Sequence, residues 1–147
     1  MSAKRGVRRR NGSSNVANAL AGIIDACTLA GILFGEPEAA GLDLDCRPDQ
    51  LVSTTLLQHE FANICVKKHR RVGLSVETVL DKFRQYESLG VRVESVSGPE
   101  VVAVAIRYGL SSYDAGYLWL AMVKNLPLLT LDKKLGTAYQ LALEESA

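Results

Sequence analysis

Residues 19–25 read Ala-Leu-Ala-Gly-Ile-Ile-Asp, and this stretch decides the fold of the chain. Its first six residues are small or branched and apolar, and Asp25 is the first charged residue after Arg10. A short, continuous apolar run of this kind is typical of a strand that is buried on both faces of a parallel sheet. The stretch therefore predicts a buried strand that ends in a carboxylate.

A second stretch near the C-terminus has the same arrangement. Residues 127–131 read Pro-Leu-Leu-Thr-Leu, and Asp132 follows as the first charge before a helix expected over residues 133–145. Asp25 likewise precedes a short apolar helix, expected over residues 28–34. In open α/β sheets, binding and catalytic sites are built at the carboxyl ends of strands. We therefore expect both carboxylates at a site of this kind.

Helical patterns and short strand patterns alternate between these two stretches. Strands are predicted at residues 51–52 and, near a sheet edge, at residues 91–96, where apolar and polar side chains alternate. Further helices are predicted after residue 98 up to Gly109 and from a Ser112 cap onward, with Leu118, Ala121 and Met122 on the buried face. Helices between short apolar strands predict parallel strands joined by crossovers, and hence an α/β fold, a three-layer α/β/α sandwich with a short central parallel sheet.

Two helices are expected in the middle of the chain. The first is predicted from a cap at Ser53 or Thr54 to about Arg70, and the second over residues 76–89 after a Ser75 cap. The apolar stripe of the first helix consists of Leu57, Phe61, Ile64 and Cys65.

Length and charge predict one folded domain with a basic extension. The chain has 147 residues, 48% of them hydrophobic, which suits a single core. Residues 1–10 carry five basic side chains and no acid, whereas the remaining 137 residues carry 12 basic and 16 acidic ones. We expect residues 1–18 to form a basic, disordered tail and residues 19–147 to form the domain. The tail could contact phosphates or serve only as a solubilising extension.

Membrane insertion and a disulfide framework are not expected. The longest uncharged run, residues 11–24, is 14 residues long and partly polar, whereas a membrane-spanning helix needs about 20 apolar residues. The three cysteines, Cys27, Cys46 and Cys65, are too far apart for a CxxC metal site. We expect reduced thiols and a cytoplasmic protein with no membrane partner.

Glu60 and Asp114 are two further candidate site residues. Asp114 falls in the first turn of its helix, where the macrodipole favours an ionised carboxylate. Glu60 and Asn63 are three residues apart on a predicted helix and therefore share a face that is distinct from the apolar stripe. Taken singly, each acid also has an ordinary explanation, as a helix cap, a first-turn residue or an exposed helix charge.

The four acids together favour a metal site. Two carboxylates about 4 Å apart repel each other by about 4 kcal/mol at a typical effective dielectric. A cluster of four ionised carboxylates therefore needs compensation, and a divalent cation supplies it. Ligands that are all oxygen select hard ions, and Mg²⁺ (or Mn²⁺) suits a site that shares its coordination with a phosphate.

Four blocks of the sequence resemble a known family. Together they resemble the PIN domain, and specifically the VapC-like toxins of type II toxin–antitoxin systems, over residues 19–147. The blocks, in family order, are Ile-Ile-Asp-Ala-Cys-Thr-Leu-Ala-Gly at residues 23–31, Leu-Gln-His-Glu-Phe-Ala-Asn at residues 57–63, Gly-Leu-Ser-Ser-Tyr-Asp-Ala-Gly-Tyr at residues 109–117 and Leu-Thr-Leu-Asp-Lys-Lys-Leu at residues 129–135. This resemblance implies a metal-dependent endoribonuclease that leaves a 5′-phosphate, is inhibited by a cognate antitoxin protein and forms a homodimer. Cys27 departs from the family, which often has serine there, and the basic tail lies outside the pattern.

From this we hypothesise a role for each site residue. Asp25, Asp114 and Asp132 bind Mg²⁺ or Mn²⁺ directly or through water, and Glu60 completes or orients the ligand set, so that all four are catalytic. Asn63 and Thr130 support these ligands or face a phosphate of the RNA substrate. The metal lowers the pKa of a bound water that attacks the phosphodiester.

Two other functions are compatible with the sequence. Metal-free cleavage would need His59 and His69, but ten residues on one helix turn them about 280° apart. A catalytically silent PIN-fold module that binds RNA or a protein partner is the second alternative. The cluster at residues 67–71 is either a solvated basic helix end or a guide for RNA, and the aromatics Tyr113, Tyr117 and Trp119 belong to the core, a dimer interface or a base-stacking surface.

Overall fold

The stretch around Ile23 forms the centre of a small parallel sheet. The computed structural model describes residues 19–42 and 46–147, so the expected basic tail, residues 1–18, lies outside the described residues. The sheet has the strand order β3-β2-β1-β4, and all three of its pairings are parallel. Ile23 pairs with Val52 on one side and with Leu128 on the other. The strands are β1 (Gly22–Ile24), β2 (Leu51–Thr54), β3 (Arg92–Glu94) and β4 (Leu128–Leu129).

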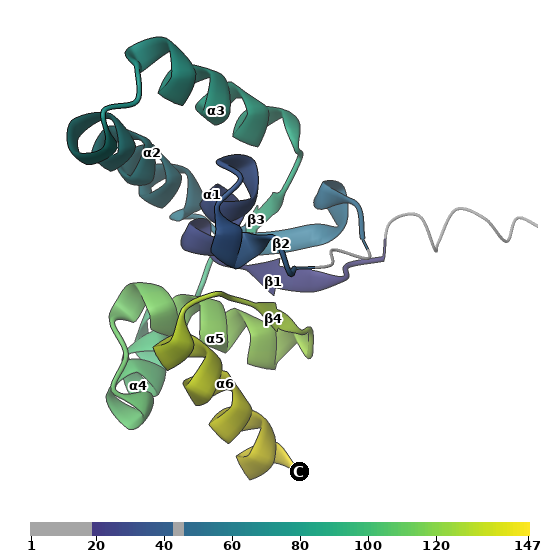
Figure 1. Cartoon of the computed structure of the whole chain (residues 1–147). Coiled ribbons are helices and arrows are strands. Elements are labelled where there is room, and N and C mark those ends of the chain that lie inside the picture. The colour runs from purple at the N-terminus through teal and green to yellow at the C-terminus, as the bar shows by residue number, and fades with distance from the viewer. Residues whose placement is uncertain (1–18, 43–45) are drawn as a thin grey trace, which may run out of the picture.

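Helices cover both faces of this sheet, as Figure 1 shows. On one face lie α1 (Ala26–Leu33), α2 (Leu57–Lys67) and α3 (Val76–Ser88). On the other face lie α4 (Gly98–Tyr108), α5 (Ser112–Lys124) and α6 (Lys133–Ser146). Short turns of 3₁₀ helix lie at Pro37–Ala39 and Pro48–Gln50, and a π-helical turn at Lys68–Val72 follows α2. The expected three-layer α/β/α architecture with a short parallel sheet is confirmed.

The alternation of side chains along β1 divides the core in two. Successive residues of a strand point to opposite faces of the sheet. Ile23 accordingly packs in a cluster with residues of α5 and α6, and Ile24 packs in a cluster with residues of α1 and α2. Phe61 of the predicted apolar stripe is fully buried in the second cluster, where its ring stacks on Tyr86 with centroids 4.7 Å apart. Each helical layer therefore has its own apolar core, and the sheet separates the two.

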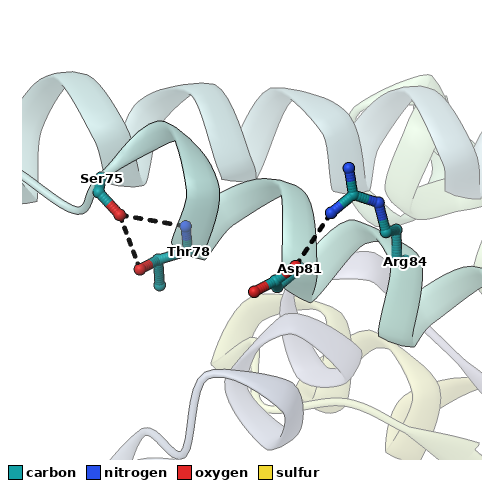
Figure 2. A network of polar contacts seen from close by, with 4 residues as sticks. All are labelled: Ser75, Thr78, Asp81 and Arg84. Carbon is teal, nitrogen blue, oxygen red and sulfur yellow. Dashed lines mark hydrogen bonds and ion pairs between the residues drawn. The ribbon is translucent and has the colours of Figure 1, made fainter.

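Side-chain caps define where several helices begin. At the start of α3, the Ser75 hydroxyl accepts a hydrogen bond from the backbone nitrogen of Thr78 at 3.1 Å, as predicted, and lies 2.8 Å from the Thr78 hydroxyl (Figure 2). Further along the same helix, Asp81 and Arg84 form an ion pair at 2.9 Å (Figure 2). Gly109 ends α4 in the left-handed conformation with φ of 65°, also as predicted.

Three local predictions are wrong. Ser53 and Thr54 do not cap a helix, because both are buried residues of β2, and α2 begins only at Leu57. The cap of α5 is Ser111 and not Ser112. Met122 is 40% exposed, whereas the expected buried face of α5 is otherwise found. No helix in the described ranges combines the length and the apolar character needed to cross a lipid bilayer.

The one-residue shift of the α5 cap leads to a stability prediction. Ser111→Ala removes the hydroxyl that accepts from the backbone nitrogen of Asp114 at 3.2 Å, so it should lower the free energy of unfolding by about 1 kcal/mol. Ser112→Ala, at the exposed neighbouring position, should change it by less than about 0.5 kcal/mol. Urea denaturation of both variants measures the difference. A larger loss in Ser112→Ala would contradict the cap assignment.

Candidate metal centre

Asp25 occupies a fixed position at the carboxyl end of the central strand. It follows β1 directly, is 4% exposed and caps α1. Its Oδ1 accepts a hydrogen bond from the backbone nitrogen of Thr28 at 2.9 Å, and its Oδ2 accepts one from the Thr130 hydroxyl at 2.5 Å. Because both carboxylate oxygens have a fixed donor, the orientation of the side chain is set by the backbone of α1 and by the segment that follows β4.

Thr130 and Thr28 connect Asp25 to Asp132. The Thr130 hydroxyl accepts a hydrogen bond from the backbone nitrogen of Asp132 at 3.1 Å, and the buried Thr28 hydroxyl accepts one from the backbone nitrogen of Leu131 at 2.9 Å. Asp132 in turn caps α6, since its Oδ1 accepts from the backbone nitrogen of Leu135 at 2.8 Å. The expected juxtaposition follows from the topology, because β1 and β4 are parallel neighbours.

Glu60 is held by a residue from the opposite helical layer. The hydroxyl of Tyr117, a residue of α5 that is 1% exposed, donates to Glu60 Oε2 at 2.6 Å. The other oxygen of the carboxylate, Oε1, is buried and has no hydrogen-bond partner among the described residues. Buried polar atoms without a partner are rare in folded proteins and call for a specific explanation. A cation or an ordered water is the kind of group that satisfies such an atom.

Glu60 and Asp114 line one cavity. Asp114 lies in the first turn of α5, as predicted. The negative charge of its carboxylate raises the pKa of Glu60. The cavity has a volume of about 480 Å³, and Asn63 also lines it. Its remaining lining residues are Leu56, His59, Ser111 and Tyr113.

The pKa shifts show that the acids act on one another. Burial raises the pKa of Glu60, and the charges of Asp114 and Asp25 raise it further, whereas the hydrogen bond from Tyr117 lowers it. Burial also raises the pKa of Asp114, with further contributions from Asp132 and Asp25, opposed by Ser111 and Lys134. Both pKa values are raised because burial and neighbouring negative charges make each carboxyl group harder to ionise.

The thiol of Cys27 is affected by the negative charges of all four candidate acids. Its pKa is raised first by partial burial and then by the four acids predicted from the sequence, Asp25, Glu60, Asp114 and Asp132. Asp25 and Asp132 are thus joined through Thr130, Glu60 and Asp114 line one cavity, and the charges of all four acids act on the Cys27 thiol.

The four acids do not form a closed cage. Within residues 19–42 and 46–147, no group of three or more His, Cys, Asp or Glu side chains is arranged so that it could hold a metal ion. A structural zinc site needs such a closed set of ligands. Mg²⁺ instead keeps several waters and is bound through one or two carboxylates together with substrate phosphates. The open arrangement and the unpartnered Oε1 of Glu60 fit an ion of this second kind.

Sequence reasoning missed Thr28 and Ser53 and gave Tyr117 no part in the site. Ser53 donates to the carbonyl of Ile24 at 2.8 Å and so joins the carboxyl ends of β1 and β2. Tyr117 had a usable signal, because it follows Asp114 by three residues on one helix and therefore lies near the same face. Thr28 follows Asp25 by three residues and had the same signal.

The two histidines lie in different places. His59 is exposed on α2 and lines the cavity that contains Glu60 and Asp114. His69 lies in the π-helical turn, where its Nδ1 donates to the carbonyl of Leu74 at 2.7 Å. It lines a separate, largely apolar cavity of about 480 Å³ between α2 and α3, which none of the four acids lines. A catalytic pair of these histidines at one substrate is therefore excluded by their positions.

Comparison with known proteins shows the fold and no more. No family model matches the chain, and no curated protein does. Among solved structures, the chain is similar to the crystal structure of PAE2754 from Pyrobaculum aerophilum, with a TM-score of 0.67 and 22% sequence identity. The match covers 86% of this chain and 96% of that one. The chain therefore has the expected PIN-like α/β fold over most of its length.

The raised pKa of Glu60 leads to a prediction about pH. A folded-state pKa above the ordinary value of 4.5 means that the folded protein binds this proton more tightly than the unfolded chain does. The stability contributed by the protonated group is then complete below pH 4.5 and is lost as the pH rises through the folded-state pKa. In the presence of chelator, Glu60→Gln should therefore flatten the fall in the free energy of unfolding with rising pH. Urea titrations at several pH values measure this slope, and an unchanged slope would contradict the assignment.

Proposed function

We propose that this protein is a metal-dependent endoribonuclease of the PIN type, which hydrolyses RNA phosphodiester bonds. The observation that carries the proposal is the buried, unpartnered Oε1 of Glu60 beside three further acids at the carboxyl end of a parallel sheet. The PIN-like fold and the four ordered sequence blocks support it independently.

The residues that would hold Mg²⁺ or Mn²⁺ are Asp25, Asp114, Asp132 and Glu60. When bound, such an ion supplies an activated water near neutral pH and stabilises the charge that develops on the scissile phosphate. The chain's own contribution is positioning. Thr130 and the start of α1 hold the carboxylate of Asp25, and Tyr117 holds that of Glu60. The raised pKa of the Tyr117 hydroxyl, caused first by burial and then by Glu60, keeps it protonated as a donor.

The biological setting is proposed from the sequence blocks. Their likeness to the VapC-like toxins supports a cytoplasmic toxin whose activity is blocked by a cognate antitoxin protein and which works as a homodimer. Asn63 lines the cavity with Glu60 and is exposed, which suits a role facing the RNA phosphate. Thr130 has the supporting role in this proposal, since it already bonds Asp25.

A second candidate function has one observation in its favour. A catalytically silent PIN-fold module that binds RNA or a protein partner needs no metal ligands, and among the described residues no group of three or more His, Cys, Asp or Glu side chains is arranged so that it could hold a metal ion. Such a module would bind its partner equally well whether or not Asp25 is charged. Cleavage therefore separates the two candidates.

Cleavage of a mixed pool of structured RNA by the purified protein tests the proposal. Cleavage should occur with Mg²⁺ or Mn²⁺, stop in EDTA and be lost in Asp25→Asn, which keeps an acceptor for the α1 cap but removes the charge. Asp81→Asn, on the exposed side of α3, is the matched control and should cleave normally. Cleavage that persists in EDTA, or in Asp25→Asn, would refute the metal-dependent mechanism.

Thermal unfolding gives a test that does not depend on finding the right RNA. A cation that relieves repulsion among the acids should raise the melting temperature, and a concentration about 100 times its Kd should add about 2.7 kcal/mol. For a chain of this size that corresponds to a rise of about 5–10 °C. Asp114→Asn should reduce the rise, and Asp81→Asn should not. A melting temperature that does not respond to Mg²⁺ or Mn²⁺ would count against the cation site.

A further inference from the structure

A groove with three cationic side chains lies between the end of α4 and the first turns of α6. Its volume is about 470 Å³. Lys133, Thr137 and Leu141 line it from positions i, i+4 and i+8, which form one face of α6. The other lining residues are Arg107, Tyr108, Lys134 and Ala138.

The charges of this groove are only partly neutralised. The carboxylate of Glu145 accepts hydrogen bonds from Arg107 at 2.7 Å and from the Tyr108 hydroxyl at 2.6 Å, so Arg107 has a partner. Lys133 and Lys134 are both exposed, and neither takes part in an ion pair within the described part of the chain. The groove therefore keeps a net positive charge, because the two lysines remain after Arg107 has paired with Glu145.

The groove begins at the residue that follows Asp132. Lys133 lies directly after Asp132, at the start of α6, and lines the groove together with Lys134. A polynucleotide that placed one phosphodiester at the acids would therefore have neighbouring phosphates close to these lysines. The other basic cluster, residues 67–71, lies at the far end of α2, about 10–17 Å along the helix axis from Glu60 at 1.5 Å per residue.

We propose that the groove formed by Lys133, Lys134 and Arg107 binds the phosphate backbone of single-stranded RNA next to the scissile bond. The proposal rests on the proposed nuclease function and adds where the substrate lies. Residues 19–147 carry a net charge of −4, from 12 basic and 16 acidic side chains, so backbone binding needs a local cationic surface. The two lysines supply charge–phosphate contacts of the kind that dominate affinity for nucleic acids.

The salt dependence of RNA binding tests this placement. Fluorescence anisotropy of a labelled single-stranded RNA oligonucleotide, with the full-length Asp25→Asn protein and Mg²⁺, gives the slope of log K against log salt between about 50 and 200 mM. The double variant Lys133→Gln/Lys134→Gln, in the same background, should reduce the magnitude of the slope by about 1.4, because each phosphate contact to a single strand contributes about 0.7. It should also weaken binding about tenfold at about 100 mM salt.

The matched control is Lys67→Gln/Arg71→Gln, which removes the same charge from the other basic cluster and should leave the slope unchanged. Equal slopes in the Lys133/Lys134 variant and the parent, no RNA binding by the parent, or a loss confined to the control would each overturn the proposal. Tighter binding of an oligo-glutamate peptide of equal charge, with the same dependence on the two lysines, would assign the groove to an acidic protein segment instead. Melting curves check that the variants remain folded.

The wild-type cleavage assay separates the two proposals. If the wild type cleaves RNA but the lysine variant binds with an unchanged slope, the nuclease function stands and the groove assignment fails. If the slope falls as expected but the wild type does not cleave, the groove binds RNA in a protein without nuclease activity.

Discussion

The structure depends on the hydrogen bond between the Thr130 hydroxyl and the carboxylate of Asp25. This bond joins the carboxyl ends of two parallel neighbours, β1 and β4, and the same hydroxyl also accepts from the backbone of Asp132. Asp25 and Asp132, which are more than a hundred positions apart in the sequence, are thereby held at the same edge of the sheet. The Thr28 hydroxyl also accepts a hydrogen bond from the backbone of Leu131 in the same segment. The start of α1 and the segment before α6 are therefore joined at the site where catalysis is proposed to take place.

Concentrating acids at this point opposes folding. Glu60 and Asp114 are partly desolvated and face further negative charge, and the pKa of each is raised for both reasons. Each ionised carboxyl group therefore weakens the folded state near neutral pH. Functional sites often carry such local strain, which the rest of the fold must offset. Here the two apolar clusters on the faces of the sheet provide that support, and a bound cation would relieve the repulsion directly.

The layers of the fold could be predicted from the alternation of helical and strand patterns, and the juxtaposition of Asp25 and Asp132 from their positions at the carboxyl ends of two parallel strands. The apolar run before Asp25 is typical of a buried strand, and the run before Asp132 has the same arrangement. Local boundaries were harder to predict. Ser53 and Thr54 look like helix caps, but burial in β2 outweighs that local preference. The bond between Tyr117 and Glu60 joins residues 57 positions apart on different layers, and no local pattern reports such a contact.

The two outer strands of the sheet limit how copies of this chain can associate. An unpaired strand edge exposes a row of backbone donors and acceptors that can pair with another chain. Here β4 is two residues long and is preceded by Pro127, while β3 is three residues long and begins with the exposed, charged Arg92. Short edges with charge or proline discourage such pairing. Extension of the sheet from one molecule to the next through these two edges is therefore disfavoured.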